Sequence, residues 1–279
     1  MKRITLCVDD FGLHAGVNAA VLRLAELGRI GATSCQVAGP AWREGAPQLA
    51  ALAPGRLDVG LHLDLTECTL DAGVRKPLAA LIVGAYARQL DLVRIRAEIV
   101  AQLDAFEVAF GRAPDCVDGH RHIHQLPGVR EALVDVLAAR YPARPPWLRI
   151  ALPRRGPWAQ QLRDPAAASK AWLIGTLGSR RLRQLATARG LGASRHLLGV
   201  YDFEGDVAHF SKLLAGWMAE AVTGDVIMCH PSAQPARADD VIGAARSREY
   251  EVLAGPVYAE LAAAANVSSA PLSRILAGG

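Results

Sequence analysis

Acidic and histidine side chains follow four apolar segments of the 279-residue chain, each where the segment ends. Carboxylate and imidazole groups bind divalent metal ions and transfer protons, so several of them together are typical of a hydrolytic site. Packing alone explains such a pattern poorly, because burying an unpaired carboxylate costs several kcal/mol. The residues concerned are Asp9 and Asp10, His62 and Asp64, the segment 118–124, and His230.

The first pair of acids, Asp9 and Asp10, follows the apolar stretch 4–8 and precedes Gly12. Side chains alternate along a strand, so one acid should face the site and the other should point aside. A turn of the chain would change this, and Gly12 makes a turn plausible. In the functional interpretation, one of the two acids is a metal ligand and lies beside a second carboxylate. The alternative is that one of the two caps the following turn.

Three histidines at alternate positions, His120, His122 and His124, follow Asp118 and Gly119. They would share one face of a strand, but beyond Gly119 we expect a loop, so at most one or two should reach a single metal ion. Asp118 is well placed to accept a hydrogen bond from an imidazole and so fix its tautomer. A surface histidine patch is the alternative.

Two further histidines close strand segments. His62 lies among leucines, where a hydrogen-bonded core histidine is the alternative to a metal ligand. His230 precedes Pro231, and the residue before a proline favours an extended conformation, so the strand should persist to its end. An imidazole there could be a general acid, or it could be structural.

Together these residues indicate hydrolysis at a mononuclear metal with one carboxylate and two histidine ligands. A free carboxylate would take a proton from water, and an imidazolium would protonate the leaving group. This suits an amide, because an amine leaves poorly until it is protonated. Zn²⁺, Mn²⁺, Fe²⁺ and Co²⁺ fit such mixed ligands. The alternatives are a metal-dependent phosphoesterase or another C–N hydrolase, and a non-catalytic sugar- or lipid-binding barrel.

The elements that must position these residues alternate between short apolar runs and longer helical patterns, which predicts an α/β fold. Its parallel strands could form an open doubly wound sheet or a barrel, and in both the site gathers at the carboxyl ends of the strands. Strands are expected at 4–8, 33–38, 57–65, 116–117, 148–152, 196–200 and 225–229, and helices at 17–27, 94–110, 127–141, 207–221 and 257–265.

Residues 153–195 are rich in Arg, Gly and Ala and depart from this alternation. Helical patterns near 166–177 and 180–188 favour an insertion or cap over the core. The small-residue tail after the last helix is expected to be frayed. We see no linker or repeat, so we expect one domain over residues 1–279.

Composition excludes several classes of protein. Apolar residues make up 51% and charged residues 21%, the ordinary globular range, and the net charge of +4 gives no reason to expect nucleic acid. The five cysteines form no C-x-x-C pair, so we assign them no chemistry. The start lacks the apolar core of a signal peptide, and no apolar run approaches the ~20 residues that span a bilayer. We expect a soluble, cytoplasmic protein without a transmembrane segment.

In this order along the chain, the motifs resemble those of the YdjC-like carbohydrate deacetylases of the ChbG/HpnK type. The matching stretches are Val8-Asp9-Asp10-Phe11-Gly12-Leu13 with Asn18, Thr33-Ser34 with Gly39-Pro40, Gly60-Leu61-His62-Leu63 with Leu65-Thr66-Glu67, Asp118-Gly119-His120-Arg121-His122-Ile123-His124, and Met228-Cys229-His230-Pro231. Arg121 stands where the family often has another histidine, and residues 153–195 match nothing in the family pattern.

The resemblance implies a (β/α)-barrel-like fold, TIM-like and incomplete or distorted, and removal of an N-acetyl group from an amino sugar, oligosaccharide or glycolipid. It implies a divalent metal, commonly Mg²⁺, held by Asp10, His62 and His120, with Asp9 as the base and His230 as the acid. It also makes a lipid-linked sugar and a homodimer conceivable. It assigns no role to His122 or His124, and it leaves substrate choice to residues 153–195.

Overall fold

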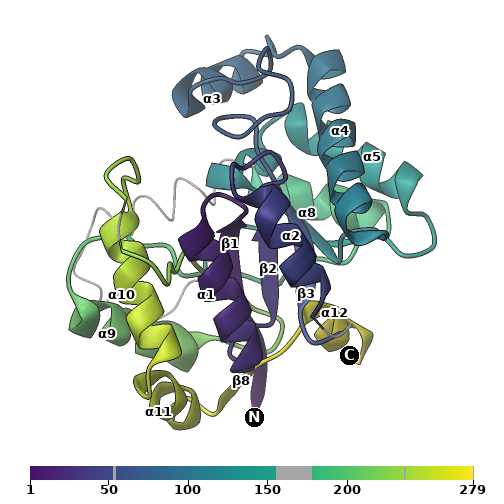
Figure 1. Ribbon diagram of the computed structural model, residues 1–279. Helices are drawn as coiled ribbons and strands as arrows, with labels where there is room; N and C mark the ends of the chain where they lie inside the picture. Colours follow the sequence, from purple (N-terminus) through teal and green to yellow (C-terminus); the bar gives the residue numbers. More distant parts are fainter. Residues whose placement is uncertain (53–54, 155–177, 236, 279) are drawn as a thin grey trace.

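The computed structural model describes residues 1–52, 55–154, 178–235 and 237–278, and its centre is a parallel β-sheet (Figure 1). The strand order is β5-β4-β3-β2-β1-β7-β6, with β8 paired to β1 outside this path. The strands are β1 (Lys2–Phe11), β2 (Ala32–Cys35), β3 (Asp58–Leu63), β4 (Cys116–Gly119), β5 (Trp147–Leu148), β6 (Leu197–Leu198), β7 (Val226–Cys229) and β8 (Val267–Ser269).

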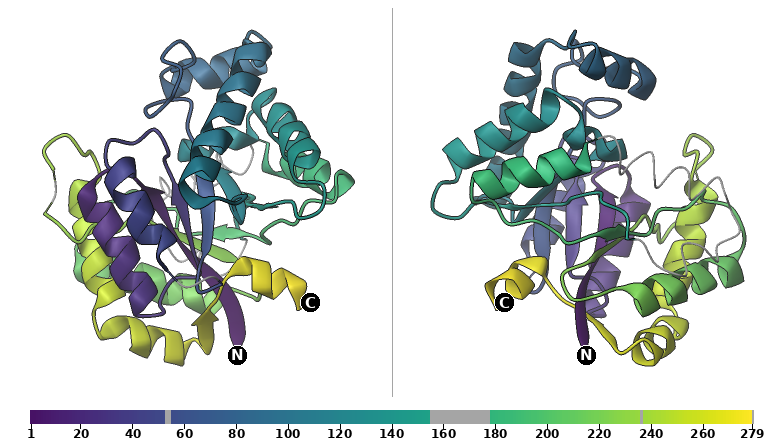
Figure 2. Two further views of the ribbon diagram at one scale, coloured as in Figure 1. Left: turned by 45° about the vertical axis from the view of Figure 1, so that its right-hand side comes forward. Right: turned by 180° about the vertical axis from the view of Figure 1, so that it is seen from behind.

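Helices connect these strands and cover the sheet, and Figure 2 shows their arrangement from two further directions. The helices α1 and α2 lie in front of the first three strands in Figure 1, α3 stands beyond the carboxyl ends of these strands, and α4 packs against α2 and β3. The helices are α1 (Ala15–Glu26), α2 (Trp42–Ala50), α3 (Leu78–Tyr86), α4 (Leu92–Phe110), the 3-10 helix η1 (His120–Gln125), α5 (Val129–Arg140), α8 (Ser179–Ala188), α9 (Val207–Glu220), α10 (Gly243–Ala254), α11 (Val257–Ala264) and α12 (Leu272–Ala277).

The sheet has the incomplete barrel-like form that the family resemblance implies, and in the described residues isolated bridges connect each outer strand to the segment beside the other. Leu148 of β5 bridges Ala193, and Pro153 bridges Leu197 of β6, both in parallel fashion. These bridges bring the ends of the sheet together without a continuous ladder. The fold is therefore an incomplete parallel barrel surrounded by helices, and its carboxyl ends form one rim.

Most of the expected elements are confirmed, with shifted boundaries. The strand expected at 4–8 extends from Lys2 to Phe11, and the strand expected at 33–38 ends at Cys35. The first helix ends before Gly28, whose φ of +66° is the left-handed conformation expected just after a helix. The helical pattern at 180–188 is confirmed as α8, whereas the one at 166–177 lies outside the described residues.

Three helices, α2, α3 and α10, were not predicted from the sequence, and the prediction of a frayed tail is wrong. Gly45 and Pro47 lie inside α2 and read as breakers in the sequence. After α11 the chain forms β8 beside β1, and α12 then buries Leu272 completely and Ile275 to 7% exposure. The tail closes the amino end of the barrel. It is ordered because it packs against the barrel, and its small residues gave no local sign of this packing.

The described part of 153–195 packs against the barrel through α8, whose Leu182 and Ala186 are fully buried in the core. Within the part of the chain that the structure describes, no helix is both long enough and apolar enough to cross a bilayer.

Candidate active site

A bulge at the end of β1 brings Asp9 and Asp10 into the same site. Val8 pairs with Thr33 of β2 and Phe11 with Cys35, so β1 has one residue more than β2 over this stretch. Asp10 occupies the extra turn with a φ of +68°, a strained conformation for a residue other than glycine. The bulge overrides strand alternation, and both carboxylates are buried at the rim.

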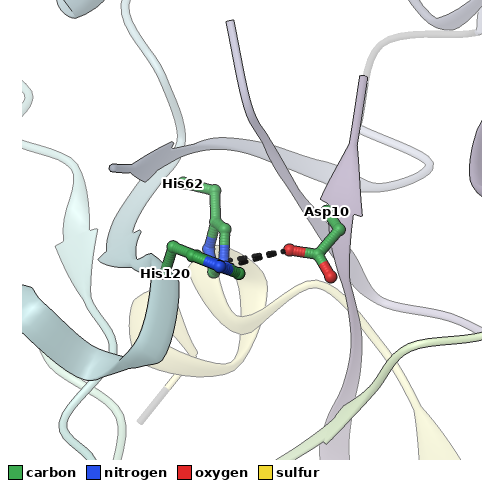
Figure 3. A group of neighbouring side chains, drawn as sticks. All are labelled: Asp10, His62 and His120. Atoms are coloured by element: carbon green, nitrogen blue, oxygen red, sulfur yellow. Dashed lines mark ion pairs between the residues drawn. The ribbon is translucent and has the colours of Figure 1, made fainter. Parts of the chain in front are cut away.

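Asp10 meets His62 and His120, which come from β3 and from the start of η1 (Figure 3). Its Oδ1 lies 3.4 Å from Nε2 of His62 and 3.3 Å from Nδ1 of His120. One ligand atom from each residue lies within 4.8 Å of the other two. The structure therefore brings together the three residues that the family resemblance implies as metal ligands.

His62 is oriented by the register between β3 and β4, which places it directly beside Asp118. Its Nδ1 lies 2.6 Å from Oδ1 of Asp118 and 3.1 Å from Oγ of Ser34. A proton on Nδ1 donated to Asp118 leaves the lone pair of Nε2 facing the carboxylate of Asp10. Two electron-rich atoms at this distance need a positive charge between them, so these residues fit a cation.

Without a metal, protons supply that positive charge. Burial opposes the charge on His62, but Asp118 and Asp10 outweigh it and raise the pKa of His62 to about 10. Burial likewise opposes the charge on His120, yet Asp10 and Glu67 raise its pKa to about 9. A divalent cation would replace these protons with charge at the same place.

Asp9 is held by Arg149, a fully buried arginine that follows β5. The guanidinium donates from Nη1 to Oδ1 at 2.5 Å and from Nη2 to Oδ2 at 2.8 Å. Burial favours protonation of Asp9, but Arg149 outweighs it and holds the carboxyl pKa below its usual range. The same Nη1 lies 3.0 Å from Asp118. Arg149 therefore contacts two buried acids and keeps Asp9 ionised.

The sequence analysis missed Arg149. Its signal was a single arginine inside the apolar strand pattern 148–152, where a charged side chain is buried only with a partner.

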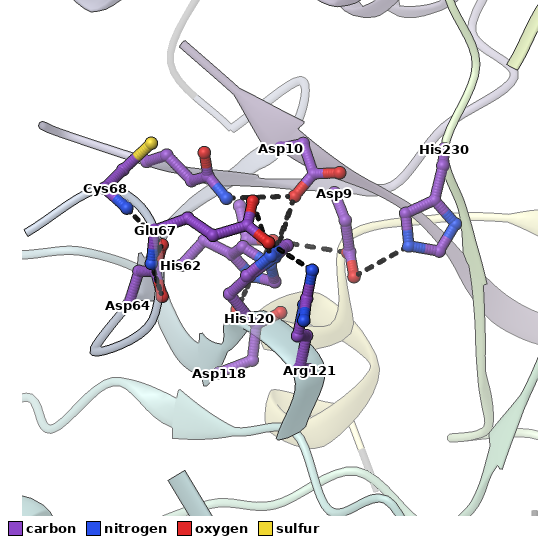
Figure 4. Close-up of polar contacts among 12 residues, drawn as sticks. Asp9, Asp10, His62, Asp64, Glu67, Cys68, Asp118, His120, Arg121 and His230 are labelled. Carbon is purple, nitrogen blue, oxygen red and sulfur yellow. Dashed lines mark hydrogen bonds and ion pairs between the residues drawn. The ribbon is translucent and has the colours of Figure 1, made fainter. Parts of the chain in front are cut away.

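His230 follows β7 and faces Asp9 from the other side (Figure 4). The last registered pair of β1 and β7 is Val8 with Cys229, so Asp9 and His230 are the next residues on neighbouring strands. Nε2 of His230 lies 3.8 Å from Oδ2 of Asp9. Burial lowers the pKa of His230 to about 4, so this imidazole is neutral at neutral pH.

The backbone of His230 is held by Glu249 of α10, a buried acid that accepts its N–H. Glu249 also accepts the Tyr201 hydroxyl at 2.7 Å. The ring of Phe203 stands edge-on to His230, with 5.3 Å between the centroids. These contacts fix the strand end from which His230 projects.

Glu67 and Arg121 form the exposed rim beside His120. Glu67 pairs with Arg121, and its Oε2 lies 3.5 Å from Nε2 of His120 (Figure 4). The loop that carries Glu67 winds around the carboxylate of Asp64, which accepts the backbone N–H groups of Thr66 at 2.7 Å and Cys68 at 2.6 Å. Glu67 and Arg121 are each 42% exposed, so this rim is the solvent-facing side of the cluster.

His122 and His124 lie outside the group of candidate ligands because the chain enters η1 directly after Gly119. Arg121 and His122 have φ values of +52° and +60°, so the backbone reverses and the alternation of a strand is lost. Nε2 of His124 lies 2.8 Å from the backbone oxygen of Arg149, and its ring is fully buried. Of the three histidines, His120 alone lies in the cluster, within the expected maximum of one or two.

His196 lies beside a strand but outside the site. It precedes β6 at the amino end of the barrel, with Nδ1 2.9 Å from Asp225. The chemistry is therefore concentrated at the carboxyl rim.

Known proteins resemble this chain over most of its length. The family described as YdjC-like protein matches residues 3–264. A human protein named carbohydrate deacetylase is 27% identical over 249 residues, which cover 82% of this chain and 74% of that protein. A Serratia marcescens chitooligosaccharide deacetylase is 33% identical over 145 residues, which cover 46% of this chain and 53% of the relative.

Solved structures share the fold. An Enterococcus faecalis V583 protein, described as a candidate for cellobiose-phosphate cleavage, superposes with a TM-score of 0.69 at 19% identity and covers 98% of both chains. A lactam utilization protein from Thermus thermophilus superposes with a TM-score of 0.53 at 15% identity, covering 97% of this chain and 99% of that one. With the family match over residues 3–264, the conclusion is that this chain belongs to the YdjC-like protein family.

Proposed function

We propose that this protein is a metal-dependent carbohydrate deacetylase that removes the N-acetyl group of an amino sugar, oligosaccharide or glycolipid. The observation that carries the proposal is the convergence of Asp10, His62 and His120 beside Asp9 and His230. The printed names of the human and Serratia relatives, carbohydrate deacetylase and chitooligosaccharide deacetylase, support the substrate class.

In this proposal Asp10, His62 and His120 hold a divalent metal. When bound, such a metal polarises an amide carbonyl and lowers the pKa of water. The family resemblance favours Mg²⁺, whereas two imidazole ligands also suit Zn²⁺, Mn²⁺ and Co²⁺. Adding each metal back to stripped protein would identify the one that supports activity.

Asp9 and His230 supply the proton transfers. Asp9 is ionised and accepts a proton from the attacking water. His230 begins neutral, and its Nε2 is 3.8 Å from Asp9, so it can take over that proton. It then donates the proton to the nitrogen of the leaving amine as the C–N bond breaks. One proton thus passes from water to the product amine, and the acetic acid that forms ionises to acetate.

The test is acetate release from N-acetylglucosamine and short chitooligosaccharides by purified protein. We expect release with a divalent metal and its loss after chelation, with recovery on adding the metal back. Phosphate release from a phosphoester panel without any acetate would instead favour the phosphoesterase alternative. Tight sugar binding without turnover under every metal condition would favour a binding protein.

A further inference from the structure

A second buried arginine, Arg246 of α10, contacts the other candidate ligand acid, Asp10. Its Nη2 donates to Oδ2 of Asp10 at 2.8 Å, and its Nε donates to Oδ2 of Asp240 at 2.7 Å. Its Nη1 lies 3.3 Å from the backbone oxygen of His230. The side chain is 3% exposed, so this guanidinium has given up almost all of its hydration.

Burying a guanidinium costs several kcal/mol of free energy unless acids and other acceptors pair with it. The groups that pair with Arg246 therefore show what holds it in place. Asp240 fixes the outer end of the arrangement, because it accepts from His14 Nε2 at 3.2 Å and from the backbone N–H of Ile242 at 3.2 Å. The plane of the guanidinium is thus set by Asp240, and its two Nη groups reach the site. Arg246 connects the end of β1 to the end of β7.

The two oxygens of the Asp10 carboxylate have different partners. Oδ2 belongs to Arg246, whereas Oδ1 faces His62 and His120. A carboxylate on a strained backbone with a φ of +68° needs such a restraint, because the bulge by itself does not set the side-chain angle. Gln36 adds a second restraint, with Nε2 3.2 Å from Oδ1.

We propose that Arg246 is a positioning residue of the candidate metal site: by occupying Oδ2 of Asp10, it presents only Oδ1 to the metal. This inference rests on the proposed metal site. A guanidinium beside a metal ligand also repels a cation, so charge alone predicts that its removal tightens metal binding. Positioning predicts the opposite, and the two effects can be separated by experiment.

The experiment is a Co²⁺ titration of chelator-treated protein. Calorimetry measures the affinity, and the visible absorption of bound Co²⁺ reports on the coordination geometry. Arg246→Met should weaken Co²⁺ binding by about 10- to 100-fold, the usual effect of losing a group that orients a metal ligand. The absorption band should change shape, because the coordination geometry changes. Arg246→Lys keeps the charge but not the planar fork, and it should remain impaired.

Arg237→Met is the matched control, because Arg237 pairs with Asp239 in an exposed loop near Asp240. It should leave Co²⁺ binding and the spectrum unchanged. Asp240→Asn keeps Arg246 but weakens the contact that fixes its guanidinium. It should weaken Co²⁺ binding too, by less than Arg246→Met does. This second variant serves as the test if Arg246→Met does not fold.

Unchanged or tighter Co²⁺ binding by a folded Arg246→Met protein, or by Asp240→Asn where that variant is the test, would overturn the positioning role and leave the metal site intact. Failure of the parent protein to bind Co²⁺ in a way that requires Asp10 would overturn the metal site itself, and the role of Arg246 with it.

Discussion

Asp9 and Asp10 are neighbours in the sequence, yet their carboxylates have different partners and therefore different chemistry. Arg149 binds both oxygens of Asp9, whereas Arg246 binds one oxygen of Asp10, and the other oxygen faces two imidazoles and the Gln36 amide. Burial raises the pKa of each acid, and its arginine is the main group opposing that rise, so both stay ionised. Two arginines thus give adjacent acids different surroundings, which suits the proposed roles of Asp9 as the base and Asp10 as a metal ligand.

Asp9→Asn should separate metal binding from catalysis. The amide keeps the size of the side chain but cannot accept the proton, so we expect kcat to fall by about 10²- to 10⁴-fold. Metal affinity, measured by calorimetry, should stay within a few-fold of the parent, because Asp9 is outside the ligand cluster. Acetate release within threefold of the parent rate would refute the assignment of Asp9 as the base.

Glu249→Gln should change the pH dependence of stability. Burial raises the pKa of Glu249 to about 7, above its unfolded value of about 4.3. The folded protein therefore keeps a proton that the unfolded chain loses over this range. This contribution to the free energy of unfolding is fully present below about pH 4, and about 3 kcal/mol is lost as the pH rises to about 7.

The glutamine variant has no such proton, so urea unfolding at pH 5, 6, 7 and 8 should show a flatter profile than the parent. Glu251→Gln, at an exposed position of the same helix, is the control and should keep the parent slope. Identical slopes for Glu249→Gln and the parent would contradict the buried proton.

At the scale of elements, the register between strands decides which side chains meet. His62 lies beside Asp118 because Leu61 pairs with Val117, and this close pairing depends on Gly60. A Cβ at position 60 would lie 2.2 Å from Sγ and 2.6 Å from the backbone oxygen of Cys116. The β3–β4 contact therefore leaves no room for a side chain at this point.

Gly60→Ala should force β3 away from β4. We expect a loss of about 1–3 kcal/mol in the free energy of unfolding, together with weaker metal binding because His62 moves from Asp118. Urea unfolding and Co²⁺ titration would measure both effects. Gly84→Ala in α3 is the control, since its nearest contact is the flexible Leu90 side chain, and alanine favours a helix there. Unaltered stability of Gly60→Ala would show that the strands can separate freely.

At the scale of the whole molecule, the two ends of the chain meet at the amino end of the barrel, opposite the site (Figure 1). Asp58 at the start of β3 accepts Nε1 of Trp147 at 2.9 Å and the backbone N–H of Ser273 at 2.9 Å. These bonds tie α12 to β3 and connect β3 to the outer strand β5. The tail therefore stabilises the barrel without contributing to its chemistry.

Leu272→Ala should destabilise the protein by about 2–5 kcal/mol, because it removes a fully buried side chain from the closed end of the barrel. Urea unfolding would measure the loss, and metal affinity of the folded fraction should be unchanged. Leu276→Ala on the same helix is the control, since Leu276 is 42% exposed and should cost little. Equal effects of the two variants would contradict the packed tail.

The alternation of strands and helices, and the kinds of residue at the strand ends, could be predicted from the amino-acid sequence. Apolar strands followed by Asp9, His62, Asp118 and His230 predict a site at one rim, because parallel strands place their carboxyl ends together. The helix α2 and the ordered tail could not be predicted from the sequence. Their glycine, proline and other small residues do not favour regular structure locally, and long-range packing holds these elements in place.

Which of the candidate side chains meet depends on contacts between distant segments of the chain. The bulge in β1 turns both acids inward, and the 3-10 turn after Gly119 keeps His120 but removes His122 and His124 from the cluster. Arg149 and Arg246 come from distant segments, and nothing local in the sequence marks them as partners of the two acids. Their positions follow from the burial of charge, which a whole fold must satisfy and a single segment cannot.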